Sequence, residues 1–195
     1  MVTIRYELDL SEGRVSIVDP QIMKLDGNLA DSSRLMDFPV KRGKWIVDVV
    51  VENYQDLGIR VESMMMKHEK IESMKIVYPP FQPKHTIWVD SGNIFIYDVD
   101  RILCPDWRDA VGNTLCYQKD HLISIVPGFG DGNYIPTMQK GHEDDVVSIE
   151  IIFITHEDLR KVRKLFSEPD SSKDDSIQGK TENGSNESRS IAETK

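Results

Sequence analysis

The sequence predicts a mainly β protein, an antiparallel β sandwich or barrel-like fold with two similar halves and one C-terminal helix. Three observations support this prediction. Short β-branched segments bounded by Gly, Pro, Asn and Asp recur along the chain, which is typical of strands. Several of these segments resemble each other in pairs and in the same order. A single segment near the C-terminus has apolar residues at helical spacing.

The paired segments indicate an internal repeat. They are Gly13–Asp19 with Gly92–Asp98, Gly43–Ile46 with Gly132–Ile135, and Val61–Glu69 with Ile149–Glu157. Their separations are 79, 89 and 88 residues, which are too long for a solenoid repeat and indicate two pseudo-repeated halves. Chance similarity among apolar strands is the alternative. If the repeat is real, Gly43 should superpose on Gly132 and Glu62 on Glu150.

The elements are expected in the following order. Residues 6–10 alternate and predict a strand, and a turn at Ser11–Gly13 leads to a second strand that ends at Pro20. Residues 21–37 are expected to be irregular. The other strands are expected at 45–51, 59–66, 71–78, 86–89, 94–97, 122–126 and 146–154. The last of these is continuously apolar, which favours a central strand covered on both faces.

The helix is expected to begin after Thr155, with Asp158 three residues later completing a capping box. Leu159, Val162 and Phe166 then share one face. These features predict four segments: a first β half at 1–78, a Pro-rich linker at 79–85, a second β half with the helix at 86–166, and a disordered acidic tail at 167–195. The tail holds too few apolar residues to fold alone.

Composition excludes some classes of function. The net charge of −9 argues against binding to nucleic acid, which requires basic surface, and against an anionic membrane. No apolar stretch is long enough to predict a membrane-spanning helix, and the first residues do not resemble a signal peptide. The two cysteines, Cys104 and Cys116, are therefore expected to be reduced thiols in a cytoplasmic protein.

The densest special motif is the Gly-rich run at residues 128–134, from which we select Gly130, Asp131, Gly132 and Tyr134 as a candidate loop. A phosphate cradle would need a following helix, and a calcium loop would need more oxygen ligands than Asp131 and Asn133. The favoured interpretation is a structural turn in which Asp131 accepts hydrogen bonds from nearby backbone amides.

Asp98 and Asp100 are the alternative candidate carboxylates. They follow an apolar strand, as in the nucleophile strand of haloacid-dehalogenase-type phosphatases, which this segment resembles. Those enzymes alternate strands with helices, however, and this chain has almost no helical segments. The histidines and cysteines lack the spacing of a zinc site. We therefore expect neither a metal nor another cofactor, and we assign no catalytic residue.

Residues 124–136, and above all the Gly-rich run, resemble a bacterial family of domains of unknown function, family 4241. Its members carry a Gly-Asp-Gly-x-Tyr-Pro-Val segment, and here Ile135 stands where the family has Pro. The resemblance implies a β-rich fold and no established activity. Some such small proteins are encoded beside toxins, so an immunity role follows by analogy only.

Two functional hypotheses remain. The favoured one is a non-catalytic protein that binds another protein, as an immunity or regulatory protein that neutralises its partner. The rival is a small hydrolase that acts on a phosphate or small-molecule substrate through Asp98, Asp100 and Asp131.

Overall fold

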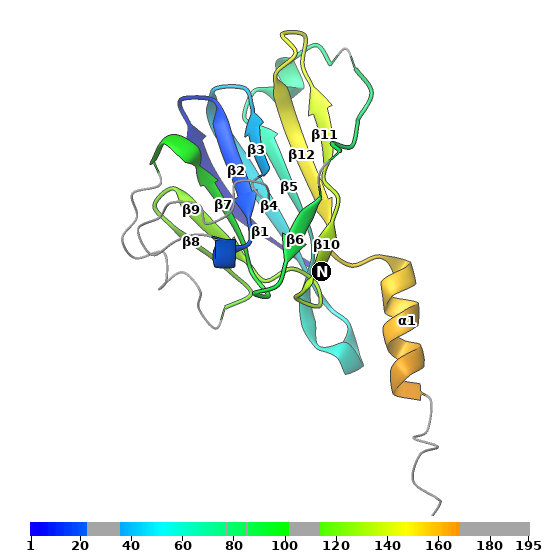
Figure 1. The fold of residues 1–195 in the computed structure, drawn as a ribbon. Coiled ribbons are helices and arrows are strands. Elements are labelled where there is room, and N and C mark those ends of the chain that lie inside the picture. The colour runs from blue at the N-terminus through cyan, green and yellow to red at the C-terminus, as the bar shows by residue number, and fades with distance from the viewer. Residues whose placement is uncertain (23–35, 77, 85, 102–113, 168–195) are drawn as a thin grey trace, which may run out of the picture. The chain divides into compact units, whose positions relative to one another are not determined.

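The computed structural model describes residues 1–22, 36–76, 78–84, 86–101 and 114–167, and within them the chain forms three antiparallel β-sheets and one α-helix (Figure 1). The predicted mainly β fold with one helix near the C-terminus is confirmed. Residues Met1–Leu159 form one compact unit, and Arg160–Lys195 form a second. The predicted tail lies outside the described residues except for Ser167.

The first sheet has five strands in spatial order β1 (Val2–Leu10), β4 (Gly43–Asn53), β5 (Ile59–His68), β12 (Val146–Ile152) and β11 (Thr137–Lys140). The second has the order β3 (Met36–Pro39), β2 (Arg14–Val18), β7 (Ile94–Asp98), β9 (Leu122–Ile125) and β8 (Cys116–Lys119). The third is a ladder of β6 (Ile87–Val89) and β10 (Gly132–Tyr134).

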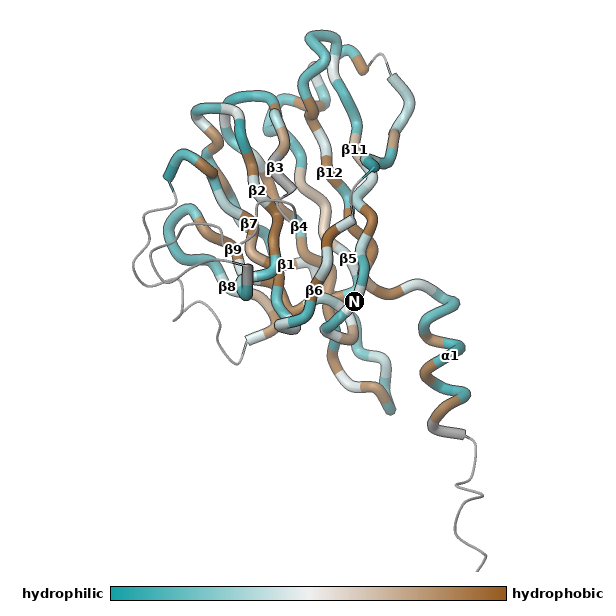
Figure 2. Tube along the Cα trace, viewed as in Figure 1, coloured by the Kyte–Doolittle hydropathy of each residue, from teal (hydrophilic) through white to brown (hydrophobic). Residues whose placement is uncertain are grey.

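A single hydrophobic core joins the first two sheets. On β4, every second side chain from Trp45 to Val51 is buried, as expected for a strand with one face on a core. All five residues of β7 are buried, including Asp98. The core cluster contains residues of both sheets, so the sheets pack face to face. Figure 2 shows hydrophobic positions recurring along these strands.

The two halves share several strand pairings. Leu10 pairs with Gly43 at the end of β1, and Val89 pairs with Gly132 at the end of β6. Leu10 and Val89 are 79 residues apart, and Gly43 and Gly132 are 89 residues apart, which are the separations of the first two repeated blocks. The peptide N–H of Lys41 donates to Val146, and that of Gly128 donates to Val61, so each half donates one such hydrogen bond to the other. The repeat remains a prediction, with which these pairings agree.

The third repeated block does not keep its predicted alignment. Trp45 contacts His68 edge to face at 6.0 Å, and Tyr134 contacts Phe153 in the same way at 5.2 Å. If Trp45 corresponds to Tyr134, His68 corresponds to Phe153, which is a separation of 85 residues. The predicted superposition of Glu62 on Glu150 requires 88 residues and does not fit these contacts. Alternating apolar residues in both strands allow such a shift without loss of sequence similarity.

The structure also corrects individual elements. Of the strand expected at 71–78, residue 77 lies outside the described residues, and the others do not form a strand, because Ile71–Ser73 is a 3₁₀ turn and Ile76 makes one isolated bridge, to Gly141. Strand β3 begins at Met36, within the last two residues of the segment 21–37 that was expected to be irregular, and residues 23–35 of that segment lie outside the described residues. The strands β8, β10 and β11 were not predicted, and each has only three or four residues.

Helix α1 (His156–Ser167) begins where it was predicted. Thr155 Oγ1 accepts the backbone N–H of Asp158, and the Asp158 carboxylate accepts the backbone N–H of Thr155, so the capping box is formed. No helix among the described residues is long and apolar enough to cross a membrane.

Candidate functional site

The β6–β10 ladder presents one face to the core and the other to solvent. Ile87 and Val89 are 1% exposed and Tyr134 is 8% exposed, whereas Trp88 between them is 55% exposed. Side chains alternate along a strand, so Thr86, Trp88, Asn133 and Ile135 share the outward side, which we call the outer β6–β10 face. Thr86 Oγ1 donates a hydrogen bond to Asn133 Oδ1 across the two strands.

Ile152 of β12 adjoins this face. Thr137 pairs with Glu150, and the Tyr134 ring contacts the Phe153 ring. Both relations fit one antiparallel register, and extending it beyond the end of β11 would set Ile135 opposite Ile152. Ile135 is 49% exposed and Ile152 is 52% exposed. From this register and from the pairing of Trp88 with Asn133 we infer that the exposed side chains of Trp88, Ile135 and Ile152 share one face, and we call them the apolar patch.

The Gly-rich loop fixes the approach of the chain to β10. Gly128 has a φ of 40°, and a Cβ there would lie 2.8 Å from the Phe153 carbonyl oxygen, so a larger residue does not fit. Gly130 has a φ of 96° and lies against Gly92 in the β6–β7 turn. The Tyr134 hydroxyl donates to the Gly130 carbonyl at 2.8 Å, which closes the loop.

Asp131 does not have the role predicted for it. Its carboxylate is exposed and makes no hydrogen bond to any residue that the structure describes, so it does not stabilise the turn. Glycine conformations and the Tyr134 hydroxyl hold the loop instead. The pairing of Val89 with Gly132 places Asp131 opposite Asp90, at one end of the outer β6–β10 face. The candidate loop Gly130, Asp131, Gly132 and Tyr134 thus borders the apolar patch.

Tyr134 is buried behind this loop. Burial raises the pKa of Tyr134 to about 12, and the negative charges of Asp158 and Asp131 add to the effect. The phenol therefore stays protonated and can keep its hydrogen bond to Gly130 at neutral pH.

Two buried aspartates lie at the C-terminal ends of strands β2 and β7. Asp19 Oδ1 accepts the Gln21 N–H at 2.7 Å, and Asp98 Oδ1 accepts the Asp100 N–H at 3.1 Å. Their second oxygens differ. Asp19 Oδ2 accepts the N–H groups of Asp90 and Ser91, and so ties β2 to the β6–β7 turn.

Asp98 Oδ2 accepts no hydrogen bond among the described residues and lies 3.5 Å from Arg101 Nε. Burial raises the pKa of Asp98 above its usual value, although the Asp100 amide and the Arg101 charge act in the opposite direction. Asp98 is fully buried, so it is not available to a substrate.

The rival hydrolase would need Asp98, Asp100 and Asp131 in one place. Asp98 ends β7, whereas Asp131 lies against Gly92, which precedes the start of the same strand. Five residues of a β-strand span roughly 13 Å. Asp131 therefore cannot share a reacting centre with the other two carboxylates. No group of three potential metal ligands occurs in the described part of the chain.

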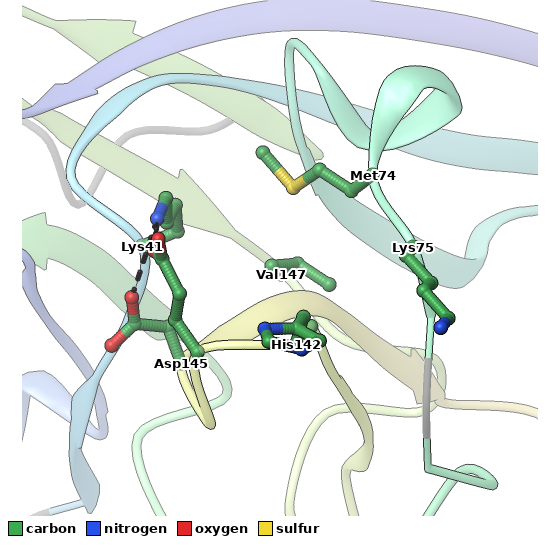
Figure 3. Close-up of a pocket in the computed structure, with 8 residues that line it drawn as sticks. Lys41, Met74, Lys75, His142, Asp145 and Val147 are labelled. Carbon is green, nitrogen blue, oxygen red and sulfur yellow. Dashed lines mark hydrogen bonds and ion pairs between the residues drawn. The ribbon is translucent and has the colours of Figure 1, made fainter.

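A surface pocket of about 170 Å³ lies away from these residues (Figure 3). It is formed by the turn after β11 and by Met74 and Lys75, with Val147 at its base. Lys41 forms ion pairs with Glu143 and with Asp145 at its rim. These carboxylates neutralise Lys41.

The sequence predicted the loop but missed the apolar patch. A signal for Trp88 was present, because it lies between Ile87 and Val89 in an alternating strand and must face the opposite way. Ile152 gave no such signal, since it belongs to a continuously apolar run.

Comparison with protein-family models, with curated proteins and with solved structures finds no match to this chain. The resemblance to bacterial family 4241 therefore stays a prediction.

Proposed function

We propose that this chain is a non-catalytic protein that binds another protein through the apolar patch of Trp88, Ile135 and Ile152. The main support for this proposal is that three large hydrophobic side chains, each about half exposed, share one face. Burying such side chains in an interface is favourable, and tryptophan is enriched among the residues that dominate binding energy.

The setting of the patch supports a binding role. The side chains rise from paired strands, and the adjoining loop is held by Gly128, Gly130 and the Tyr134 hydroxyl. A rigid surface loses little conformational freedom on association. By contrast, the carboxylates of the rival hydrolase are buried or lie apart, so no observation favours that alternative.

A neutralising role, as an immunity or regulatory protein, is part of the proposal. Such a protein needs only a stable surface that covers a site on its partner. The resemblance to family 4241 supports this role by analogy. The partner's identity would decide whether the chain is an immunity protein or a regulatory protein.

Substitution of Trp88 tests the proposal. Trp88→Ser removes the largest side chain of the patch, and Tyr117→Ser is a matched control, because Tyr117 is a 40% exposed aromatic on β8 of the second sheet. A partner is first captured from the native host, identified and purified, and its affinity for each variant is measured by calorimetry. Trp88→Ser should weaken binding about tenfold or more. Tyr117→Ser should leave the affinity unchanged. Equal losses in both variants, or none in Trp88→Ser, would reject this face as the binding site.

A further inference from the structure

The outer β6–β10 face differs from its counterpart in the first half in a way that indicates the chemistry of the partner. The counterpart positions follow from the pairings. Trp88 pairs with Asn133, one residue along each strand from the pair Val89–Gly132. In the first half, Asp9 pairs with Lys44, one residue along each strand from the pair Leu10–Gly43. By the same steps Asp131 corresponds to Arg42. Ile152 corresponds to Lys67, since each precedes the aromatic residue that contacts β10 or β4.

The counterpart face of the first half is balanced in charge. Lys44 forms an ion pair with Glu7 at 2.7 Å, and Arg42 lies 4.0 Å from Glu12. Its exposed side chains are therefore satisfied by one another and by water. A face of this kind needs no partner and is typical of a solvated sheet surface.

All three cations are replaced in the second half. Where the first half has Arg42, Lys44 and Lys67, the outer β6–β10 face and the adjoining strand have Asp131, Asn133 and Ile152. Glu150 lies two residues before Ile152 on the same side of β12. The nearest basic residue along this strand is Lys84, four residues before Trp88. The apolar patch thus has carboxylates at both ends.

This arrangement complements a basic segment with apolar residues. We infer that the partner presents a segment in which an apolar side chain covers Trp88, Ile135 and Ile152 while a lysine or arginine meets Asp131. The inference rests on the proposed function and adds the partner's chemistry. An arginine beside Trp88 would also gain a cation–π contact. The chain's net charge of −9 would speed the approach of such a partner.

Peptide titration tests this chemistry without knowledge of the partner. Three synthetic peptides of about 12 residues serve as probes: alternating Val and Arg, alternating Val and Glu, and alternating Ser and Arg. Each is added to the isotope-labelled full chain, and amide and indole resonances are followed by NMR. The Val–Arg peptide should shift the Trp88 indole N–H and the signals of Asn133 and Ile135. The other two peptides should bind at least about tenfold more weakly, since each lacks one of the two complementary features.

A matched pair of variants assigns the charge effect. Asp131→Asn should weaken binding of the Val–Arg peptide about two- to fivefold, as expected for an exposed ion pair. The variant should fold normally, because the Asp131 carboxylate makes no hydrogen bond in the described part of the chain. Asp56→Asn changes an exposed aspartate on the turn between β4 and β5 and should have no effect. Raising the salt from about 50 to about 300 mM should weaken the wild-type complex and narrow the difference between the two variants.

The possible failures are distinguishable. Equal binding of the Val–Glu peptide, or no effect of Asp131→Asn, would overturn the basic partner while leaving the Trp88→Ser test of the proposed function intact. If the Val–Arg peptide shifts only the resonances of the face that carries Glu7 and Asp9, its binding is a non-specific charge effect and the inference of a basic partner is overturned. Sedimentation of the free chain tests whether it self-associates. Self-association lost in Trp88→Ser would show that the occupant is a second copy and not a basic partner.

Discussion

At the residue scale, Asp19 and Asp98 occupy equivalent strand ends but have different energetic roles. The Asp19 carboxylate accepts three backbone N–H groups, and Asp98 accepts one. An asparagine has a single acceptor oxygen, so Asp19→Asn leaves buried amides unpaired. We expect it to lower the free energy of unfolding by about 2–4 kcal/mol. Urea denaturation at neutral pH measures this change.

The comparison variant is Asp98→Asn. The asparagine oxygen can still accept the Asp100 N–H, and the variant removes a buried charge whose pKa burial has raised. Its free energy of unfolding should stay within about 1 kcal/mol of the wild type. If Asp98→Asn costs more than Asp19→Asn, the assignment of these hydrogen bonds is wrong.

Tyr134 gives the fold a dependence on alkaline pH. An unfolded tyrosine ionises with a pKa near 10, whereas burial raises the pKa of Tyr134 to about 12 in the folded chain. Between these values the unfolded state loses its proton first, so stability falls as pH rises from about 10 to 12. Below pH 10 both states are protonated and Tyr134 adds no pH dependence.

The matched variant is Tyr134→Phe, which cannot ionise. The free energy of unfolding should change less between about pH 9 and pH 11.5 in this variant than in the wild type. The two changes should differ by at most about 2–3 kcal/mol. Identical slopes in the two proteins would show that Tyr134 is exposed when folded.

At the scale of elements, the Gly-rich loop depends on Gly128. Gly128→Ala combines a positive φ with a Cβ 2.8 Å from the Phe153 carbonyl oxygen. Gly58→Ala is the control, because Gly58 also has a positive φ but its Cβ would meet nothing closer than 3.7 Å. The control should cost about 1–3 kcal/mol through its backbone conformation alone, and Gly128→Ala should cost more because the Cβ contact with Phe153 is added. Equal melting temperatures for the two variants would mean that the loop can move away from Phe153.

Strands with an alternating or continuously apolar sequence could be predicted, including three-residue β6 and four-residue β9, whereas β8, β10 and β11 could not. The alternation from Trp45 to Val51 and the apolar run at 146–152 identify strands because their own side chains fill the core. Three-residue β10 follows a glycine loop, and its strand character comes from its pairing with β6. The described residues among 71–78 show the opposite error, since Ile71 lies in a 3₁₀ turn and Ile76 in one isolated bridge.

The candidate site was predictable only in part. The glycines of residues 128–132 indicated a special backbone, and they do adopt one at Gly128 and Gly130. The role of Asp131 was not predictable, because whether a carboxylate reaches an amide depends on the exact path of the loop. The apolar patch joins residues from β6, β10 and β12, and their proximity depends on strand register.

At the scale of the whole molecule, the pairings predict that the two halves are related by an approximate two-fold rotation. Neighbouring equivalents β2 and β7 are antiparallel, as are β5 and β12, which such a rotation requires. In an experimental structure, Trp45 should superpose on Tyr134 and His68 on Phe153. A superposition that matches Glu62 with Glu150 instead would restore the alignment inferred from sequence.

The central claim is that the second half binds a partner through the outer β6–β10 face, whereas the equivalent face of the first half stays in solvent. Amide hydrogen exchange of the full chain, alone and with its purified partner, tests this claim most directly. Binding should slow exchange at residues 86–90 and 131–135 and leave residues 5–9 and 44–48 unchanged. Protection at the first-half residues, or at neither face, would contradict the claim.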